Sequence, residues 1–196
     1  MSNNFTYSIN RPGSQTHALD FHSGQQPQPG QIIRLSGPNG AGKTTLLQLL
    51  SSLIRPSEGQ SPYTSDDLFY LPHHAGMRGQ LTVWENLDYW AALFNINAKH
   101  YAKEILEITD IFELNSLLHV SLYLLSAGQQ RRAALLRLAL VQSKKLWLLD
   151  EPETSLDQAT IQKLGHIVTA YADKGGSVIW ASHQDLPTRT DGEIIL

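Results

Sequence analysis

Short apolar runs alternate with stretches of helical spacing along most of this chain. The runs at Ile32–Ser36, 67–71, 145–149 and Ser177–Ala181 are bounded by polar or turn residues, a pattern typical of strands buried on both faces of a parallel sheet. A segment of helical spacing at 44–54 follows the first run after a glycine-containing loop. The pattern therefore predicts an α/β fold with a parallel-sheet core.

A long helical block interrupts the strands. Residues 83–94 and 98–118 carry apolar side chains three and four positions apart, as expected for helices that bury one face. We predict a helical subdomain at about 74–135, inserted in the α/β core of a single domain that spans 1–196.

Composition narrows the class of protein. A chain of 196 residues with 41% apolar content can bury one substantial core. The net charge of −3 gives no general electrostatic case for binding nucleic acid or an anionic membrane.

With no cysteine, disulfides and thiolate metal sites are excluded. No apolar run approaches the roughly 18–20 residues of a spanning helix, and the polar N-terminal region resembles no signal peptide, so we expect a cytosolic protein that reaches a membrane only through a partner.

A phosphate-binding loop follows the first predicted strand. The sequence Gly-Pro-Asn-Gly-Ala-Gly-Lys-Thr at 37–44 satisfies the G-x-x-x-x-G-K-[ST] pattern and opens a predicted helix. Its glycines allow backbone N–H groups and the helix N-terminus to face phosphate oxygens. Lys43 is expected to reach the β- and γ-phosphates of ATP, and the Thr44 hydroxyl to bind Mg²⁺. The predicted ATP-binding residues are Gly37, Pro38, Asn39, Gly40, Ala41, Gly42, Lys43, Thr44 and Thr45.

Two carboxylates stand at the end of another predicted strand. Asp150 and Glu151 directly follow the apolar residues 146–149. Alone, such a pair usually just ends a strand. Together with a phosphate loop, it predicts that Asp150 holds Mg²⁺ and that Glu151 orients or deprotonates the attacking water.

A third motif resembles the signature of one class of P-loop proteins. Leu-Ser-Ala-Gly-Gln at 125–129, followed by Gln-Arg-Arg, is similar to the LSGGQ signature of the ABC ATPases. The resemblance implies a P-loop NTPase core of ABC ATPase type, with a helical subdomain and a short N-terminal β region. It also implies that the signature binds the γ-phosphate held by a second subunit, so a homodimer is expected; alone, the motif would be an ordinary helix N-cap. The signature residues are Ser126, Ala127, Gly128 and Gln129.

Other positions match the same family. Asp157 resembles the D-loop aspartate, and His183 resembles the switch histidine that assists Glu151 and Lys43 in hydrolysis. His73 stands at the Q-loop position, where most members have glutamine. Beside His74 it could instead suggest a metal site, although no third ligand has a recognisable spacing.

The family's adenine-stacking aromatic has no clear counterpart. Its position should fall near Ser14, which is not aromatic, and Tyr7 and His17 are the nearest substitutes. Phosphate contacts can still carry nucleotide affinity.

Within the family, the chain looks like the ATPases of cytochrome c maturation. The small size, the alanine at 127, His73 and the compact segment 150–157 carry this resemblance, although Glu153 is charged where that subfamily more often has an apolar residue. The resemblance implies an ATP hydrolase on the cytoplasmic face of the inner membrane, peripheral to integral membrane subunits of a haem-handling export complex. Neither haem nor nucleic acid is expected to bind this subunit. Two alternatives stay open: the ATPase of another small ABC exporter, or a non-transport ABC regulatory module.

The distance between motifs excludes one group of relatives. Lys43 and Ser126 are only about 80 residues apart, whereas chromosome-maintenance ATPases of this class separate the two regions by long coiled coils. The sequence alone therefore favours a transporter ATPase.

Overall fold

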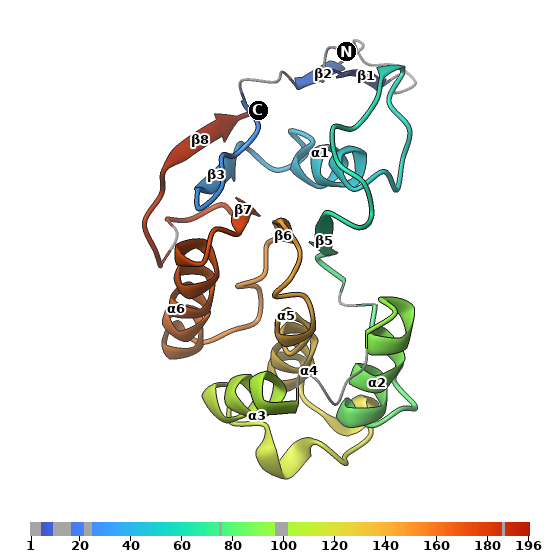
Figure 1. The fold of residues 1–196 in the computed structure, drawn as a ribbon, viewed down its shortest axis with the longest axis vertical. Coiled ribbons are helices and arrows are strands. Elements are labelled where there is room, and N and C mark those ends of the chain that lie inside the picture. Colours follow the sequence, from blue (N-terminus) through green and yellow to red (C-terminus); the bar gives the residue numbers. More distant parts are fainter. Residues whose placement is uncertain (1–4, 10–16, 22–24, 75, 97–101, 186) are drawn as a thin grey trace.

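The computed structural model describes residues 5–9, 17–21, 25–74, 76–96, 102–185 and 187–196 (Figure 1). At 5–9 and 17–20 the description covers the backbone alone. Among the described segments, no helix is both long and apolar enough to cross a membrane.

A five-stranded parallel sheet forms the centre of the molecule (Figure 1). Its order is β5 (Leu68–Leu71), β6 (Leu146–Asp150), β7 (Ser177–Ala181), β3 (Ile32–Ser36) and β8 (Gly192–Ile195). The first four match the predicted strands to within one residue at either end. The fifth, β8, was not predicted because its short alternating sequence lacks the continuous apolar run of a strand buried on both faces.

Alternate residues of each central strand face two different hydrophobic clusters. Leu146 and Leu148 of β6 pack with α1 (Lys43–Leu50) in one cluster. Trp147 and Leu149 pack with α6 (Gln158–Asp173) and the helical block in the other. Because successive strand side chains point to opposite faces, both faces of the sheet are covered, as the continuous apolar runs predicted.

The helical block lies below the sheet in Figure 1 and packs against one of its faces. Its α-helices are α2 (Val83–Leu93), α3 (Ala102–Ile111), α4 (Ala127–Leu135) and α5 (Arg137–Leu140). Two 3₁₀ turns, η3 (Asn115–Leu117) and η4 (Leu122–Leu124), connect α3 to α4. These helices fall mostly within the predicted block, whose limits at 74 and 135 stay a prediction.

Two helix boundaries were predicted wrongly. The helix at 98–118 ends at Ile111, because Glu113 adopts a left-handed backbone with φ of 57°; residues 97–101 lie outside the described part. The helix at 44–54 ends at Leu50, shortly before Ser52 with φ of 60°. A left-handed residue breaks the i to i−4 hydrogen-bond series, and hydrophobic periodicity does not report it.

A small antiparallel sheet lies at the top of Figure 1. It pairs β1 (Phe5–Ile9) with β2 (His17–Phe21) and with the two-residue strand β4 (Glu58–Gly59). This is the short N-terminal β region that the family resemblance implied.

Candidate functional site

The predicted chemical residues gather at one edge of the parallel sheet. The phosphate loop follows the carboxyl end of β3, His73 follows β5, Asp150 ends β6, and His183 follows β7. Because all five strands are parallel, these ends meet at the same edge, where ligands of open α/β sheets bind. We call it the carboxyl edge.

The phosphate loop has the backbone that its glycines permit. Gly37, Gly40 and Gly42 have φ of 146°, 81° and 111°, in the region that favours glycine. A Cβ on Gly37 would approach the Leu196 carbonyl oxygen to 2.8 Å. The Lys43 amine is buried and donates to the carbonyls of Gly37 (2.9 Å) and Pro38 (3.3 Å). The Lys43 side chain therefore folds back onto the phosphate loop and is hydrogen-bonded to its backbone.

Asp150 is buried and hydrogen-bonded on both oxygens. The hydroxyl of Thr44 donates to Oδ1 at 3.2 Å, and the hydroxyl of Tyr70 donates to Oδ2 at 3.1 Å. Burial, and next the charge of Asp150, raise the pKa of the Tyr70 hydroxyl, so it stays a donor at neutral pH. Tyr70 was missed in the sequence, where it is one aromatic of a buried strand and nothing marks the direction of its hydroxyl.

Glu151 lies between two histidines. Its Oε1 is 2.8 Å from His183 Nε2, and its Oε2 is 3.6 Å from His73 Nδ1. The other ring nitrogen of His183 lies 3.5 Å from the Lys43 amine. Glu151 has φ of 47°, a backbone that non-glycine residues seldom adopt and that concentrates at functional sites. The structure thus joins the predicted base, the switch histidine and the loop lysine.

Arg131 of α4 connects the loops of the carboxyl edge to one another. Its guanidinium donates to the carbonyls of Pro72, His73, Asp150, Glu151 and Pro152 at 2.8–3.2 Å. Burial lowers the pKa of Arg131, and nearby carboxylates, Glu153 first, oppose that shift. The sequence showed Arg131 only as part of the signature segment, because backbone partners leave no trace in residue identities.

The signature segment lies with the D-loop rather than with the phosphate loop of the same chain. Ser126 is exposed and forms a capping box with Gln129 at the start of α4, and a Cβ on Gly128 would approach the Ser155 carbonyl to 2.9 Å. Asp157 accepts the Thr160 amide at 2.7 Å and caps α6, and this contact lowers the pKa of Asp157. In Figure 1, α4 lies in the lower helical block, well apart from α1.

Two further points from the sequence concern adenine and the alternative metal site at His73 and His74. Ser14 lies outside the described residues, as do the side chains of Tyr7 and His17, so the structure does not describe how adenine would be held. The rings of His73 and His74 meet edge to face at 5.2 Å. Within the described segments, no cluster of three His, Asp or Glu side chains is arranged to hold a metal.

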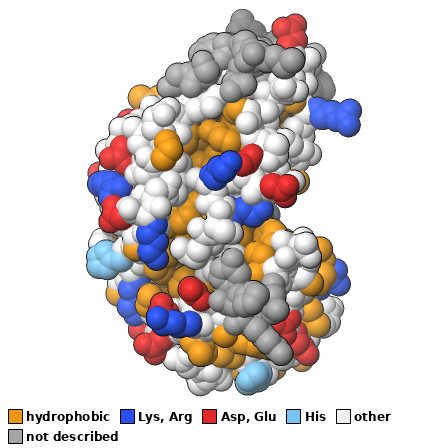
Figure 2. Space-filling model, viewed as in Figure 1, with side chains coloured by type: hydrophobic (Ala, Val, Ile, Leu, Met, Phe, Trp, Pro, Cys, Tyr) orange, Lys and Arg blue, Asp and Glu red, His pale blue; other side chains and the backbone are white. Residues whose placement is uncertain are grey.

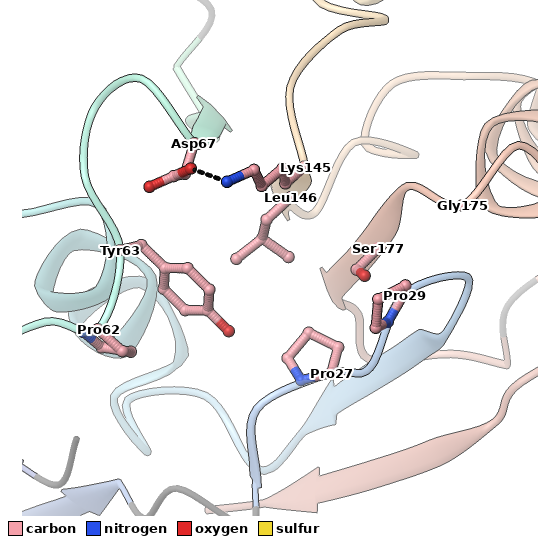
Figure 3. Close-up of a pocket in the computed structure, with 9 residues that line it drawn as sticks. All are labelled: Pro27, Pro29, Pro62, Tyr63, Asp67, Lys145, Leu146, Gly175 and Ser177. Carbon is pink, nitrogen blue, oxygen red and sulfur yellow. Dashed lines mark ion pairs between the residues drawn. The ribbon is translucent and has the colours of Figure 1, made fainter. Parts of the chain in front are cut away.

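Two other cavities lie away from the phosphate loop. One, of about 310 Å³, opens at the amino ends of β6 and β7 and is lined by Tyr63, Leu146, Ser177 and three prolines (Figure 3). The other, of about 520 Å³, is lined by Tyr70, Pro72 and the aromatic side of α2. Trp84 and Trp90 of α2 are partly buried against the core, so neither is a free surface aromatic.

These features define the ATP-binding subunit of an ABC transporter. Residues 25–154 match the family model described as ABC transporter. An ATP-binding ABC transporter protein from Pyrococcus furiosus superimposes with a TM-score of 0.75 at 23% identity, covering 100% of this chain and 96% of its own. A dimeric ATP-binding cassette solved in a post-hydrolysis state with ADP and Pi superimposes with a TM-score of 0.75 at 22% identity. The superposition covers 93% of this chain and 87% of that cassette. At such identities the likeness shows the fold.

Curated relatives place the chain more finely. The cytochrome c biogenesis ATP-binding export protein CcmA of Rhizobium johnstonii is 37% identical over 84% of this chain and 81% of its own length. The CcmA of Roseobacter denitrificans is 40% identical over 85% of this chain and 77% of its own. The chain belongs to the ABC transporter ATP-binding family and, within it, to the CcmA family.

Proposed function

We propose that this chain is the ATP-hydrolysing subunit of an ABC export complex for cytochrome c biogenesis. The observation that carries the proposal is the contact of Glu151 with His183 beside Lys43 and the phosphate loop. The names of the CcmA relatives supply the biological setting. By resemblance to the ATPases of cytochrome c maturation, the complex would drive release of a haem-loaded chaperone or transport, and this subunit would bind neither haem nor nucleic acid.

ATP would bind at the phosphate loop with its phosphates against the backbone N–H groups of residues 37–45. Lys43 would leave the carbonyls of Gly37 and Pro38, to which it donates in this structure, and move to the β- and γ-phosphates.

The donors next to the loop suit Mg²⁺. The Thr44 hydroxyl and the Asp150 carboxylate lie 3.2 Å apart, and both supply oxygen, the ligand type that Mg²⁺ prefers. When bound, the ion would neutralise charge that develops on the transferred phosphoryl group. Tyr70 would keep the second oxygen of Asp150 oriented.

Hydrolysis would need a water placed between Glu151 and the γ-phosphate. Glu151 would orient this water or accept its proton, and His183 would hold the carboxylate and contact the γ-phosphate. Lys43 would offset the charge of the transition state. His73, at the Q-loop position, would contact the second oxygen of Glu151 and so report the state of the site to the neighbouring loop.

Two copies would complete each site. Ser126 is exposed at the N-terminus of α4, where the capping box engages the amides of Ser126 and Gln129. An anion would be received at this helix N-terminus through the remaining amides of Ala127 and Gly128. Because this segment lies apart from its own phosphate loop (Figure 1), the signature would meet the γ-phosphate held by a second subunit, with Asp157 near the same interface. Closure of the dimer on ATP and opening after hydrolysis would then drive the complex.

The surface between the sheet and α2 suits the membrane subunits. Its cavity of about 520 Å³ is lined by Tyr70, Pro72, Trp90 and Phe94, and Leu53 and Leu93 beside them are 65% and 56% exposed. The outline is indented on this side of the molecule, and hydrophobic side chains are visible there (Figure 2). The subunit would sit on the cytoplasmic face of the inner membrane, with His73 and His74 near the contact.

The test is ATP hydrolysis by the purified protein and its Glu151→Gln variant, with dimerisation followed by light scattering. We expect the wild-type protein to release phosphate and the variant to accumulate as an ATP-bound dimer. Glu107→Gln, at an exposed position of α3, is the matched control and should behave as wild type. If Glu151→Gln hydrolyses ATP at the wild-type rate, the mechanism is wrong. If neither protein hydrolyses ATP even when co-purified with its membrane subunits, the ATPase function is wrong.

A further inference from the structure

A buried carboxylate that the mechanism above does not use lies beside the site. Glu153, in the loop after β6, is only 7% exposed. Its Oε2 accepts the indole N–H of Trp180 at 2.8 Å, and its Oε1 accepts the Ser182 hydroxyl at 2.5 Å. A buried charge is costly unless it is hydrogen-bonded and balanced, and both carboxylate oxygens are occupied here.

The charge of Glu153 is balanced by Arg131. Among the groups that oppose the burial-induced fall in the pKa of Arg131, Glu153 is the strongest. Arg131 in turn holds the carbonyls of His73 and Glu151. Glu153 therefore interacts electrostatically with the guanidinium that holds both loops flanking the predicted base.

Ser182 links the carboxylate of Glu153 to the backbone next to His183. It is 1% exposed and directly precedes His183. Its hydroxyl has one hydrogen, and the carboxylate of Glu153 is a stronger acceptor than the Gln184 carbonyl at 3.0 Å. The lone pairs then accept the Gln184 amide at 3.1 Å, so hydrogen bonds fix the backbone on both sides of His183.

The His183 ring itself is only partly enclosed. Its side chain is 40% exposed, and among the residues that the structure describes its polar contacts are Glu151 at 2.8 Å and Lys43 at 3.5 Å. The orientation of this half-exposed ring therefore also depends on the backbone that carries it. A displacement of about 1 Å at such a site can cost up to about a hundredfold in rate.

We propose that Glu153 is a positioning residue that holds His183 against Glu151 through Ser182. The proposal rests on the proposed function for its kinetic consequence and on the geometry alone for the placement of the ring. It assigns a role to a charged residue at a position where the subfamily more often has an apolar one.

The kinetic test uses Ser182→Ala and Glu153→Leu, with Ser177→Ala as the matched control. Ser177 is a buried serine at the start of β7, the strand that Ser182 follows, and its hydroxyl donates to the Gln28 carbonyl. We expect kcat to fall about tenfold in the first two variants with little change in KM, and to stay within about twofold in the control. In a His183→Ala background, Ser182→Ala should cost less than about twofold more, because the group on which it acts is gone. An undiminished effect in that background would show a merely structural role and overturn the proposal.

The second readout does not require activity. The ring Hε1–Cε1 signal of His183, assigned by its loss in His183→Ala, should shift in Ser182→Ala and Glu153→Leu and stay in place in Ser177→Ala. If Glu153→Leu does not fold, Ser182→Ala decides alone. An unmoved signal in Ser182→Ala overturns the proposal. If the wild-type protein hydrolyses no ATP, the proposed function fails, while this signal still decides the placement of His183.

Discussion

The two edges of the parallel sheet carry similar side chains and use them differently. At the carboxyl edge, Lys43, Asp150 and Glu151 are wholly or largely buried and contact one another through Thr44 and His183. At the amino edge, the cavity of Figure 3 is bordered by the ion pair of Asp67 and Lys145 at 2.7 Å, whose lysine side chain is 82% exposed.

Hydrogen bonds also differ between the edges. At the amino edge, hydrogen bonds also join distant segments, but they lie at exposed or half-buried positions: Lys144 donates to the carbonyls of Ser65 and Asp66, and Ser177 donates to that of Gln28. At the carboxyl edge, Arg131 and Asp150 join loops from three different strands. The burial of charged side chains that contact several loops, rather than the number of charges, marks the candidate site.

The largest expected difference concerns the two lysines. Lys43→Ala should lower kcat/KM for ATP by at least about a hundredfold, because the loop loses the cation that faces the phosphates. Lys145→Ala, at the amino edge, should stay within about twofold of wild type. Phosphate release at saturating and limiting ATP measures both, and equal losses would contradict the functional contrast between the edges.

The next pair of substitutions removes two cationic side chains that donate hydrogen bonds to backbone carbonyls. Arg131→Met should lower the free energy of unfolding by about 3–5 kcal/mol, because several buried carbonyls and Glu153 lose their partner. Lys144→Met should cost about 1 kcal/mol or less, since water can replace its contacts. Urea unfolding at pH 7 measures both, and a small loss in Arg131→Met would show that the loops are held by other contacts.

A smaller contrast is expected between two tyrosines, of which one has a hydrogen-bond partner for its hydroxyl group and the other has none in the described part of the chain. Tyr70→Phe should lower the free energy of unfolding by about 1.5 kcal/mol, because Asp150 loses a donor. The Tyr63 hydroxyl is buried without a partner among the described residues, and burial raises its pKa to about 12. Tyr63→Phe should therefore leave stability unchanged or raise it by up to about 1 kcal/mol. Thermal unfolding of both variants tests this, and destabilisation by Tyr63→Phe would point to a bound partner in the cavity of Figure 3.

The smallest effect concerns Asp67 and depends on pH. Hydrogen bonds from Lys145 and Thr64 lower the pKa of Asp67 from 3.8 to about 2. A lowered folded-state pKa means that the contact stabilises the protein above pH 3.8 and that this stabilisation is lost as the pH falls toward 2. Asp67→Asn should lower the midpoint temperature by about 2 °C or less at pH 7, as for a surface pair, and the gap should narrow below pH 4. A gap that widens on acidification would contradict the assignment.

Much of the fold was predictable because its signals are local. Each strand buried on both faces is a continuous apolar run, and the phosphate loop stands between such a run and a helix. Boundaries were less accurate where a left-handed residue such as Glu113 ended a helix. Strand β8 was not predicted because only one of its four residues, Ile194, is buried.

The identities of the chemical residues came from the sequence, whereas their contacts came from the tertiary structure. The motifs singled out Lys43, Asp150 and Glu151, because phosphate chemistry needs those groups at the ends of parallel strands, and the family resemblance added His183. Neither Tyr70 on Asp150 nor Glu153 on Ser182 could be inferred, since each contact joins segments about 30 to 80 residues apart. Such contacts depend on strand order and on the direction in which each side chain leaves the sheet, and packing of the whole chain decides both.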